Sequence, residues 1–217
     1  MKIIPCKQGT PEWMAARIGI PTASSFDRII TKTGKPSASA DRYLAKLVAE
    51  WYLGCSLDDY VSQFMERGTE MEASAVRFYE FATGVDTQEV GFIVRDDGRC
   101  GASPDRLVGD NGLLEIKCPS PEVHMTYVLG GLSDEYKVQQ QGQLWVAERE
   151  WCDLLSFHPV LPRATVRVFR DEPFIETLSG LMRDFLERLD DAKARLLPQK
   201  AERDERLQGL NEAGETT

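Results

Sequence analysis

A short segment near the middle of the chain, residues 112–118 (GLLEIKC), most constrains what this sequence can fold into. Apolar residues dominate it, and the turn sequences Asp-Asp-Gly and Gly-Asp-Asn-Gly come before it, as is typical of short strands joined in hairpins. Side chains alternate between the two faces of a strand, so Glu115 and Lys117 share one face and Ile116 points into the core. A charged pair on a buried strand needs a compensating reason. The segment therefore predicts a β-sheet that carries a functional site.

The periodicity of the rest of the chain predicts an α/β fold. Apolar residues recur at helical spacing on both sides of the hairpin region, and the order is helices, three strands, helix, two strands, helix. This order favours a mixed central sheet flanked by helices over a repeating βαβ barrel. We expect helices at 10–30 (one or two short ones), 40–54, 61–83, 134–148 and 172–197, and strands at 87–95, 100–108, 112–118, 151–158 and 163–170.

The length of 217 residues suits one domain, and a hydrophobic content of 42% is enough for a sizeable core. We expect this domain to cover residues 1–197, with a helical N-terminal part over 1–60 and a core that carries the sheet over 61–197. Residues 198–217 are charged and lack aromatic side chains, so we predict a flexible tail there.

Several classes of protein are disfavoured by composition. No stretch approaches the 18 apolar residues of a membrane span, and the N-terminus lacks the apolar region of a signal peptide, so we expect a cytoplasmic protein. The five cysteines are scattered, and we expect them to be reduced. Only His124 and His158 are available as imidazole ligands, and we expect His124 on a helix surface. Any metal must therefore be held mainly by carboxylates, which favours Mg²⁺ or Mn²⁺.

A second acidic residue is expected close to the charged strand. Asp105 comes ten residues before Glu115, across a Gly-rich hairpin, and antiparallel pairing can bring the two side chains together. Two neighbouring carboxylates repel each other, so a divalent cation is a natural way to keep both ionised. Lys117 can then orient a water molecule or stabilise charge on a phosphate. This arrangement indicates metal-assisted phosphodiester hydrolysis; the alternative is that Glu115 and Lys117 form an ordinary ion pair on an exposed strand.

Four blocks of sequence, in this order, resemble the phage-type alkaline exonuclease and YqaJ-like viral recombinase family of the PD-(D/E)XK nuclease superfamily. They are residues 17–24 (RIGIPTAS), 67–72 (RGTEME), 103–105 (SPD) with 114–119 (LEIKCP), and 139–146 (QQQGQLWV). The resemblance implies a restriction-endonuclease-like core.

The resemblance also implies roles for individual residues. The implied metal ligands are Asp105, Glu115, Glu72 and the carbonyl oxygen of Ile116. Lys117 would position the attacking water. Gln139 and Gln141 would lie near the scissile phosphate or near that water. Glu70 is an alternative to Glu72, because two residues so spaced on a helix do not share a face and only one can reach the site. We favour Glu72.

The first block is similar to the pocket that captures a 5′-terminal phosphate in this family. Arg17 offers a planar pair of donors, Ser24 lies at or near a helix N-terminus, and Ser103 could add a third donor. The alternatives are a surface salt bridge for Arg17 and a plain helix cap for Ser24.

The resemblance finally implies a Mg²⁺-dependent 5′→3′ exonuclease that acts on double-stranded DNA ends, and Mn²⁺ is expected to substitute for Mg²⁺. Such an enzyme leaves 3′ overhangs for phage-type single-strand annealing recombination. The resemblance further implies a ring-shaped homotrimer, an annealing protein as partner and a bacterial host cell. The alternatives are a structure- or site-specific endonuclease of the same fold and a non-catalytic DNA-end-binding recombination adaptor.

The net charge of −9 opposes nucleic-acid binding at first sight. However, residues 1–50 contain eight basic and four acidic side chains, so the acidic excess lies elsewhere. We therefore expect contact with DNA to be confined to one face or channel.

Overall fold

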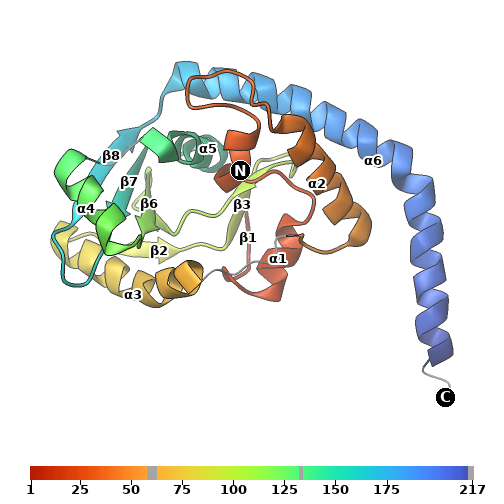
Figure 1. Cartoon of the computed structure of the whole chain (residues 1–217), viewed down its shortest axis with the longest axis horizontal. Helices are drawn as coiled ribbons and strands as arrows, with labels where there is room; N and C mark the ends of the chain where they lie inside the picture. Colours follow the sequence, from red (N-terminus) through yellow and green to blue (C-terminus); the bar gives the residue numbers. More distant parts are fainter. Residues whose placement is uncertain (58–62, 132–133, 215–217) are drawn as a thin grey trace.

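The computed structural model describes residues 1–57, 63–131 and 134–214, without the side chains of 63–70 and 211–214. Its centre is a five-stranded sheet in the order β2-β5-β6-β7-β8 (Figure 1). Only β6 and β7 pair in parallel, so the sheet is mixed, as the sequence predicts. The strands of this sheet are β2 (Thr87–Glu89), β5 (Arg106–Val108), β6 (Gly112–Lys117), β7 (Trp151–Ser156) and β8 (Ala164–Phe169).

A smaller sheet of three antiparallel strands lies beside the first. It consists of β1 (Lys2–Ile4), β3 (Phe92–Val94) and β4 (Gly101–Ala102), in the order β1-β3-β4. The prediction of single strands at 87–95 and 100–108 is therefore wrong, because each segment is divided between the two sheets.

Local backbone chemistry explains where these two segments divide. Gly91 lies so close to the N-terminal segment that an added Cβ would come within 1.9 Å of the Cys6 carbonyl oxygen. In the second segment, Pro104 has no N–H to donate to a strand ladder. The division places Ser103 and Asp105 in the short connection between the two sheets.

Helices cover both faces of the large sheet. On one face, α3 (Gln63–Thr83) packs Ala75 and Tyr79 in a cluster that includes Leu114 and Ile116 of β6. On the other face, Leu113 belongs to the main core, where it joins residues of η1 (Ala23–Arg28), α2 (Ala40–Leu53) and α5 (Lys137–Ala147). The two faces of β6 thus alternate as expected. The remaining short helices are α1 (Pro11–Arg17), α4 (Pro121–Gly130) and η2 (Asp134–Tyr136).

The last helix, α6, runs from Glu172 to Gly214, passes across the top of the molecule in Figure 1 and then projects from it. The predicted helix end at 197 is wrong, because the helix continues through Pro198. Beyond this proline, Arg203 donates to the carbonyl oxygens of Tyr52 at 3.0 Å and Leu53 at 3.3 Å, at the C-terminal end of α2. This contact between distant segments holds the extended part of α6 against α2. No helix in the described ranges is long and apolar enough to cross a membrane.

The prediction for His124 is also wrong. It lies on α4 but is fully buried, with Nδ1 2.8 Å from Ser156 Oγ and Nε2 2.7 Å from the Pro162 carbonyl oxygen. The ring therefore links α4 to the last residue of β7, which pairs with Lys117 of β6, and to the segment that joins β7 to β8.

Candidate active site

The two predicted carboxylates meet at the end of β6. Asp105 follows β4, and its Oδ2 accepts a hydrogen bond from the backbone N–H of Ile116 at 2.6 Å. Burial raises the pKa of Asp105 well above its usual value, and the neighbouring Glu115 carboxylate raises it further. The antiparallel register, in which Arg106 pairs with Leu114, places Asp105 opposite Glu115, so the two carboxylates are close enough to repel each other.

Glu115 is only 3% exposed, and both of its carboxylate oxygens accept hydrogen bonds. Oε1 accepts from Lys117 Nζ at 2.6 Å and from Gln139 Nε2 at 2.6 Å, while Oε2 accepts from Gln143 Nε2 at 2.7 Å. A buried carboxylate with this set of donors stays fixed in one orientation.

Lys117 lies on the same face as Glu115, as the strand alternation predicts. Burial lowers the pKa of its ammonium group, but the charge and hydrogen bond of Glu115 raise that pKa, and the net shift is upward. Nζ also lies 3.4 Å from Gln139 Oε1 and 5.1 Å from the centre of the Tyr136 ring. The lysine is thus a fixed positive charge beside the two carboxylates.

Glu72 approaches this group from α3 but has a partner of its own. Its Oε1 accepts from Arg106 Nη1 at 3.0 Å, and the same Nη1 donates to the Asp105 carbonyl oxygen at 2.6 Å. The Glu72 charge contributes to the raised pKa of Asp105, after burial and Glu115. The alternative residue, Glu70, has a side chain outside the described residues.

The donors at this site fit a hard divalent cation only in part. Asp105, Glu115 and the Ile116 carbonyl supply oxygen, the ligand atom that Mg²⁺ prefers. Within the described residues, however, no three side chains of His, Cys, Asp or Glu gather closely enough to hold a metal ion between them. The structure therefore brings Asp105 and Glu115 together, whereas Glu72, the third predicted side-chain ligand, forms an ion pair with Arg106.

The glutamine run of α5 divides between two environments. Gln139 reaches Glu115 and Lys117, whereas Gln141 does not: its Nε2 donates to the Phe169 carbonyl oxygen at 2.9 Å and its Oε1 accepts from the Asp171 N–H at 2.8 Å. The prediction that Gln141 faces the site is therefore wrong. Gln143 joins Gln139 at the site instead, because a spacing of four residues places both on one face of a helix.

The three predicted phosphate donors lie around the N-terminal helices. Ser103 Oγ accepts from Arg17 Nη1 at 3.2 Å and from Trp13 Nε1 at 2.9 Å, and the Arg17 guanidinium lies 4.0 Å from the centre of the Trp13 ring. Ser24, the second residue of η1, is exposed, with its Oγ 3.2 Å from Thr22 Oγ1.

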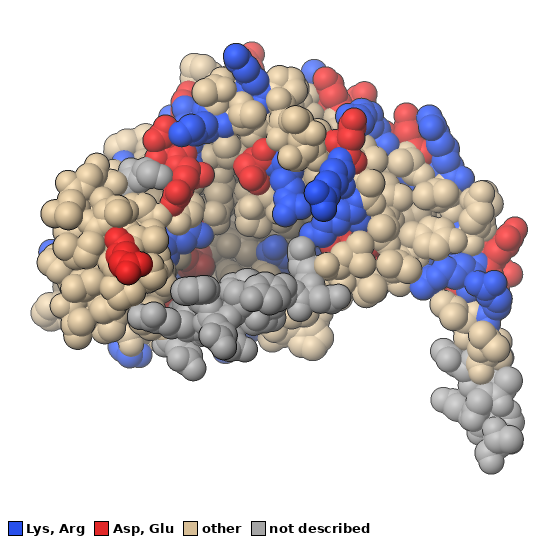
Figure 2. Space-filling model, in the orientation of Figure 1, with Lys and Arg blue, Asp and Glu red and all other residues tan. Residues whose placement is uncertain are grey.

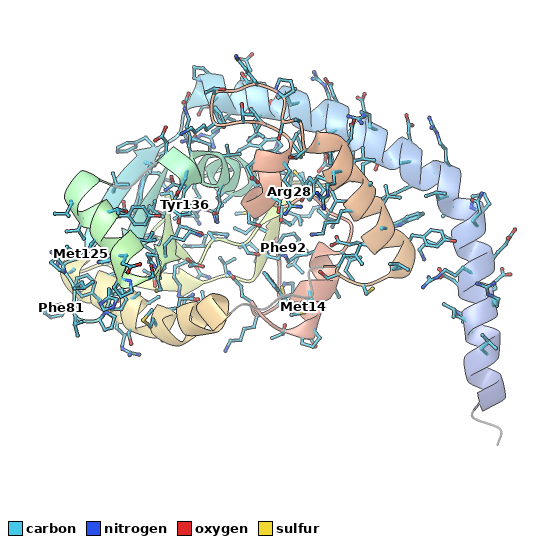
Figure 3. The ribbon with its side chains drawn as sticks, in the orientation of Figure 1. Met14, Arg28, Phe81, Phe92, Met125 and Tyr136 are labelled. Atoms are coloured by element: carbon cyan, nitrogen blue, oxygen red, sulfur yellow. The ribbon has the colours of Figure 1, made fainter. Side chains whose placement is uncertain are left out.

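Arg17, Ser24 and Trp13 line a pocket of about 230 Å³. Its wall is completed by residues of α2, including Tyr43, Lys46 and Glu50. Figure 2 shows a hollow in the middle of one face of the molecule, with Lys and Arg side chains gathered beside it over η1 and α2. In Figure 3, Tyr136 lies on one side of this region, with Phe92 and Met14 across from it. The acidic net charge is thus compatible with a positively charged wall at this place.

Comparisons with known proteins agree with this geometry. The model of the YqaJ-like viral recombinase domain matches residues 12–150. A crystal structure of an alkaline exonuclease from Laribacter hongkongensis is similar over 89% of this chain and 99% of its own, with 35% sequence identity and a TM-score of 0.79. The same enzyme is also known in a crystal structure with dAMP, with the same similarity. No match was found among curated proteins.

A phage-related exonuclease from Haemophilus somnus 129PT has the same fold at lower similarity. It matches 83% of this chain and 96% of its own with a TM-score of 0.58 and 15% identity. The mixed sheet, its flanking helices and the structural match to the alkaline exonuclease identify the predicted PD-(D/E)XK-like fold.

Proposed function

Because this chain belongs to the YqaJ-like viral recombinase domain family, we propose that it is a Mg²⁺-dependent exonuclease that degrades double-stranded DNA in the 5′→3′ direction. The family and the 35% identical alkaline exonuclease support a nuclease role in recombination. The proposed reaction leaves a 3′ single-stranded overhang, which is the substrate of strand annealing. Mn²⁺ substitutes for Mg²⁺ in this proposal.

One observation carries the exonuclease part of the proposal: Ser103 and Asp105 are two residues apart. Ser103 accepts hydrogen bonds from Arg17 and Trp13, which line the N-terminal pocket. Asp105 accepts a hydrogen bond from the backbone N–H of Ile116, next to Glu115 on β6. Two residues of extended chain span at most about 7 Å, which is comparable with the separation of neighbouring phosphates along a DNA strand. A terminal phosphate on Arg17 would therefore hold the next phosphate near the carboxylates.

The Laribacter alkaline exonuclease crystallised with dAMP supports the same assignment. This ligand is a single nucleotide with one phosphate group, which corresponds to the product that hydrolysis one nucleotide from an end would release. The pocket around Arg17, of about 230 Å³ and with Ser24 at its edge, offers donors for such a phosphate.

The residues at the end of β6 have distinct roles in this proposal. Asp105, Glu115 and the Ile116 carbonyl would hold the cation, and Glu72 would join them on leaving Arg106. A bound divalent cation supplies Lewis-acid stabilisation of the phosphate oxygens. Lys117 holds and orients the attacking water and stabilises negative charge on the phosphate, and Gln139 fixes Lys117 and Glu115 relative to each other.

The test is the digestion of end-labelled linear duplex DNA with and without Mg²⁺, with either a phosphate or a hydroxyl at the 5′ end. We expect mononucleotide release from the 5′ end, faster on phosphorylated ends, only with Mg²⁺ or Mn²⁺. A covalently closed circular duplex should survive the same incubation. Cleavage of the circle would instead identify an endonuclease, and binding of ends without cleavage under any metal would identify a non-catalytic adaptor.

Two further parts of the proposal concern assembly. We expect three copies of the chain to form a ring around the duplex, and a single-strand annealing protein to bind the ring and take up the overhang. Sedimentation at the working concentration measures the first, and a strict monomer would contradict threading of the duplex through a ring.

A further inference from the structure

We propose that Gln143 is a positioning residue of the nuclease site, which fixes the Glu115 carboxylate in the orientation required to hold the divalent cation; this inference rests on the proposed function. The glutamine is 1% exposed, and its Nε2 donates to Glu115 Oε2 at 2.7 Å. The other oxygen, Oε1, is held by Lys117 and Gln139. Among the described residues, Gln143 thus provides the hydrogen bond that fixes the second oxygen.

The chemistry of an amide suits this position. A second ammonium or guanidinium group on Oε2 would neutralise the charge that attracts a cation, whereas an amide orients the oxygen and leaves that charge in place. Gln139 and Gln143 are four residues apart on α5, so one helix face delivers a donor to each oxygen of Glu115. The carboxylate cannot rotate without breaking one of these bonds.

The burial of Gln143 has a cost that packing alone does not explain. Its Oε1 is buried and has no hydrogen-bond partner in the described part of the chain. A buried acceptor without a partner is destabilising, and an apolar side chain of similar volume would avoid this. The amide at this position is therefore accounted for by its bond to Glu115, and not by the packing of α5.

Gln141 provides a matched control on the same helix. It is also 1% exposed, but its amide nitrogen and its amide oxygen both form hydrogen bonds with backbone atoms, those of Phe169 and Asp171. Its role is to tie α5 to the segment between β8 and α6. A substitution of Gln141 therefore removes a buried amide of the same size from the same helix without touching Glu115.

The test measures Mn²⁺ binding to the full chain without DNA, by calorimetry, for wild type, Gln143→Met and Gln141→Met, together with thermal unfolding of each. Loss of a hydrogen-bond partner behind a metal ligand weakens metal affinity by about tenfold to a hundredfold. We expect this increase in the Mn²⁺ Kd for Gln143→Met and a change below about twofold for Gln141→Met. The Mg²⁺ concentration at half-maximal nuclease rate should rise for the first variant only, while the KM for DNA stays unchanged.

The possible results separate the inference from the function on which it rests. An unchanged Mn²⁺ Kd in Gln143→Met, with normal binding by wild type, would overturn the role of Gln143 and leave the proposed function intact. A wild-type chain that neither binds Mn²⁺ nor degrades DNA would overturn both. If Gln143→Met does not fold, Gln143→Asn, which keeps the amide but is too short to reach Glu115, must show the same loss of affinity for the inference to stand.

Discussion

The substitution Arg17→Ala should abolish most of the preference for 5′-phosphorylated ends while the protein remains folded. In the structure, Arg17 donates to Ser103 at 3.2 Å and stacks on Trp13 at 4.0 Å, at the wall of the N-terminal pocket. The same guanidinium is the planar donor that our proposal assigns to the terminal phosphate. Its removal should therefore affect binding of the DNA end more than folding.

The two effects can be estimated separately. Loss of a hydrogen bond to a charged phosphate costs about 1.5–3 kcal/mol, which corresponds to a reduction of about tenfold to a hundredfold in the preference for 5′-phosphate over 5′-hydroxyl. Loss of the hydrogen bond from the guanidinium to the Ser103 hydroxyl and of the contact with Trp13, all partly exposed, costs about 1–2 kcal/mol of folding free energy. In a chain of this size that lowers the Tm by only a few degrees.

The assay compares kcat/KM on 5′-phosphorylated and 5′-hydroxyl linear duplexes for each variant. Arg42→Ala is the control, because Arg42 is an exposed arginine of the same basic N-terminal segment and does not line the pocket. It removes the same charge and should keep the discrimination. If Arg17→Ala discriminates between the two ends as well as wild type, the assignment of the phosphate anchor is refuted.

Three further predictions concern the catalytic end and its support. Lys117→Ala should retain DNA binding, measured by fluorescence anisotropy, but lose cleavage; full activity would contradict the role of this lysine. Gly142→Ala should destabilise the chain by about 1–3 kcal/mol, seen as a lower midpoint in urea, because the added Cβ would lie 2.6 Å from the buried Phe26 ring. Burial and Glu115 raise the pKa of Asp105, so in the folded metal-free chain this carboxyl keeps a proton that it loses above pH 3.8 in the unfolded chain. Its unfolding free energy, relative to Asp105→Asn, should therefore fall as pH rises from 3.8 to the folded-state pKa, and Mg²⁺ should reverse the loss at neutral pH; a flat difference would contradict the raised pKa.

Much of the candidate site follows from local rules that a sequence already contains. A period of two along residues 112–118 is enough to place Glu115 and Lys117 on one face and Ile116 on the other. A hairpin of known length is enough to bring Asp105 back to the same strand. These rules involve neighbouring residues only, so they hold before any long-range contact forms.

The rotation of α5 was decided by tertiary structure. Four glutamines occupy positions 139–143, and helical periodicity alone does not say which of them face the sheet. Gly142 permits α5 to lie directly against Phe26 of η1, and this contact turns Gln139 and Gln143 toward Glu115 and Gln141 toward Phe169. The contact joins residues more than a hundred positions apart, which no local pattern encodes.

The same distinction applies to the ends of elements and to the phosphate pocket. The sequence indicated a helix over 172–197, but Arg203 extends the ordered contact with α2 beyond Pro198. It also indicated three donors for a phosphate, and the structure placed Arg17 and Ser103 in contact, two residues from Asp105. The sequence by itself thus determined which side chains share a strand face and which chemistry they offer. Only the tertiary structure decided which distant side chains reach them, because helix rotation and loop position depend on the packing of the whole core.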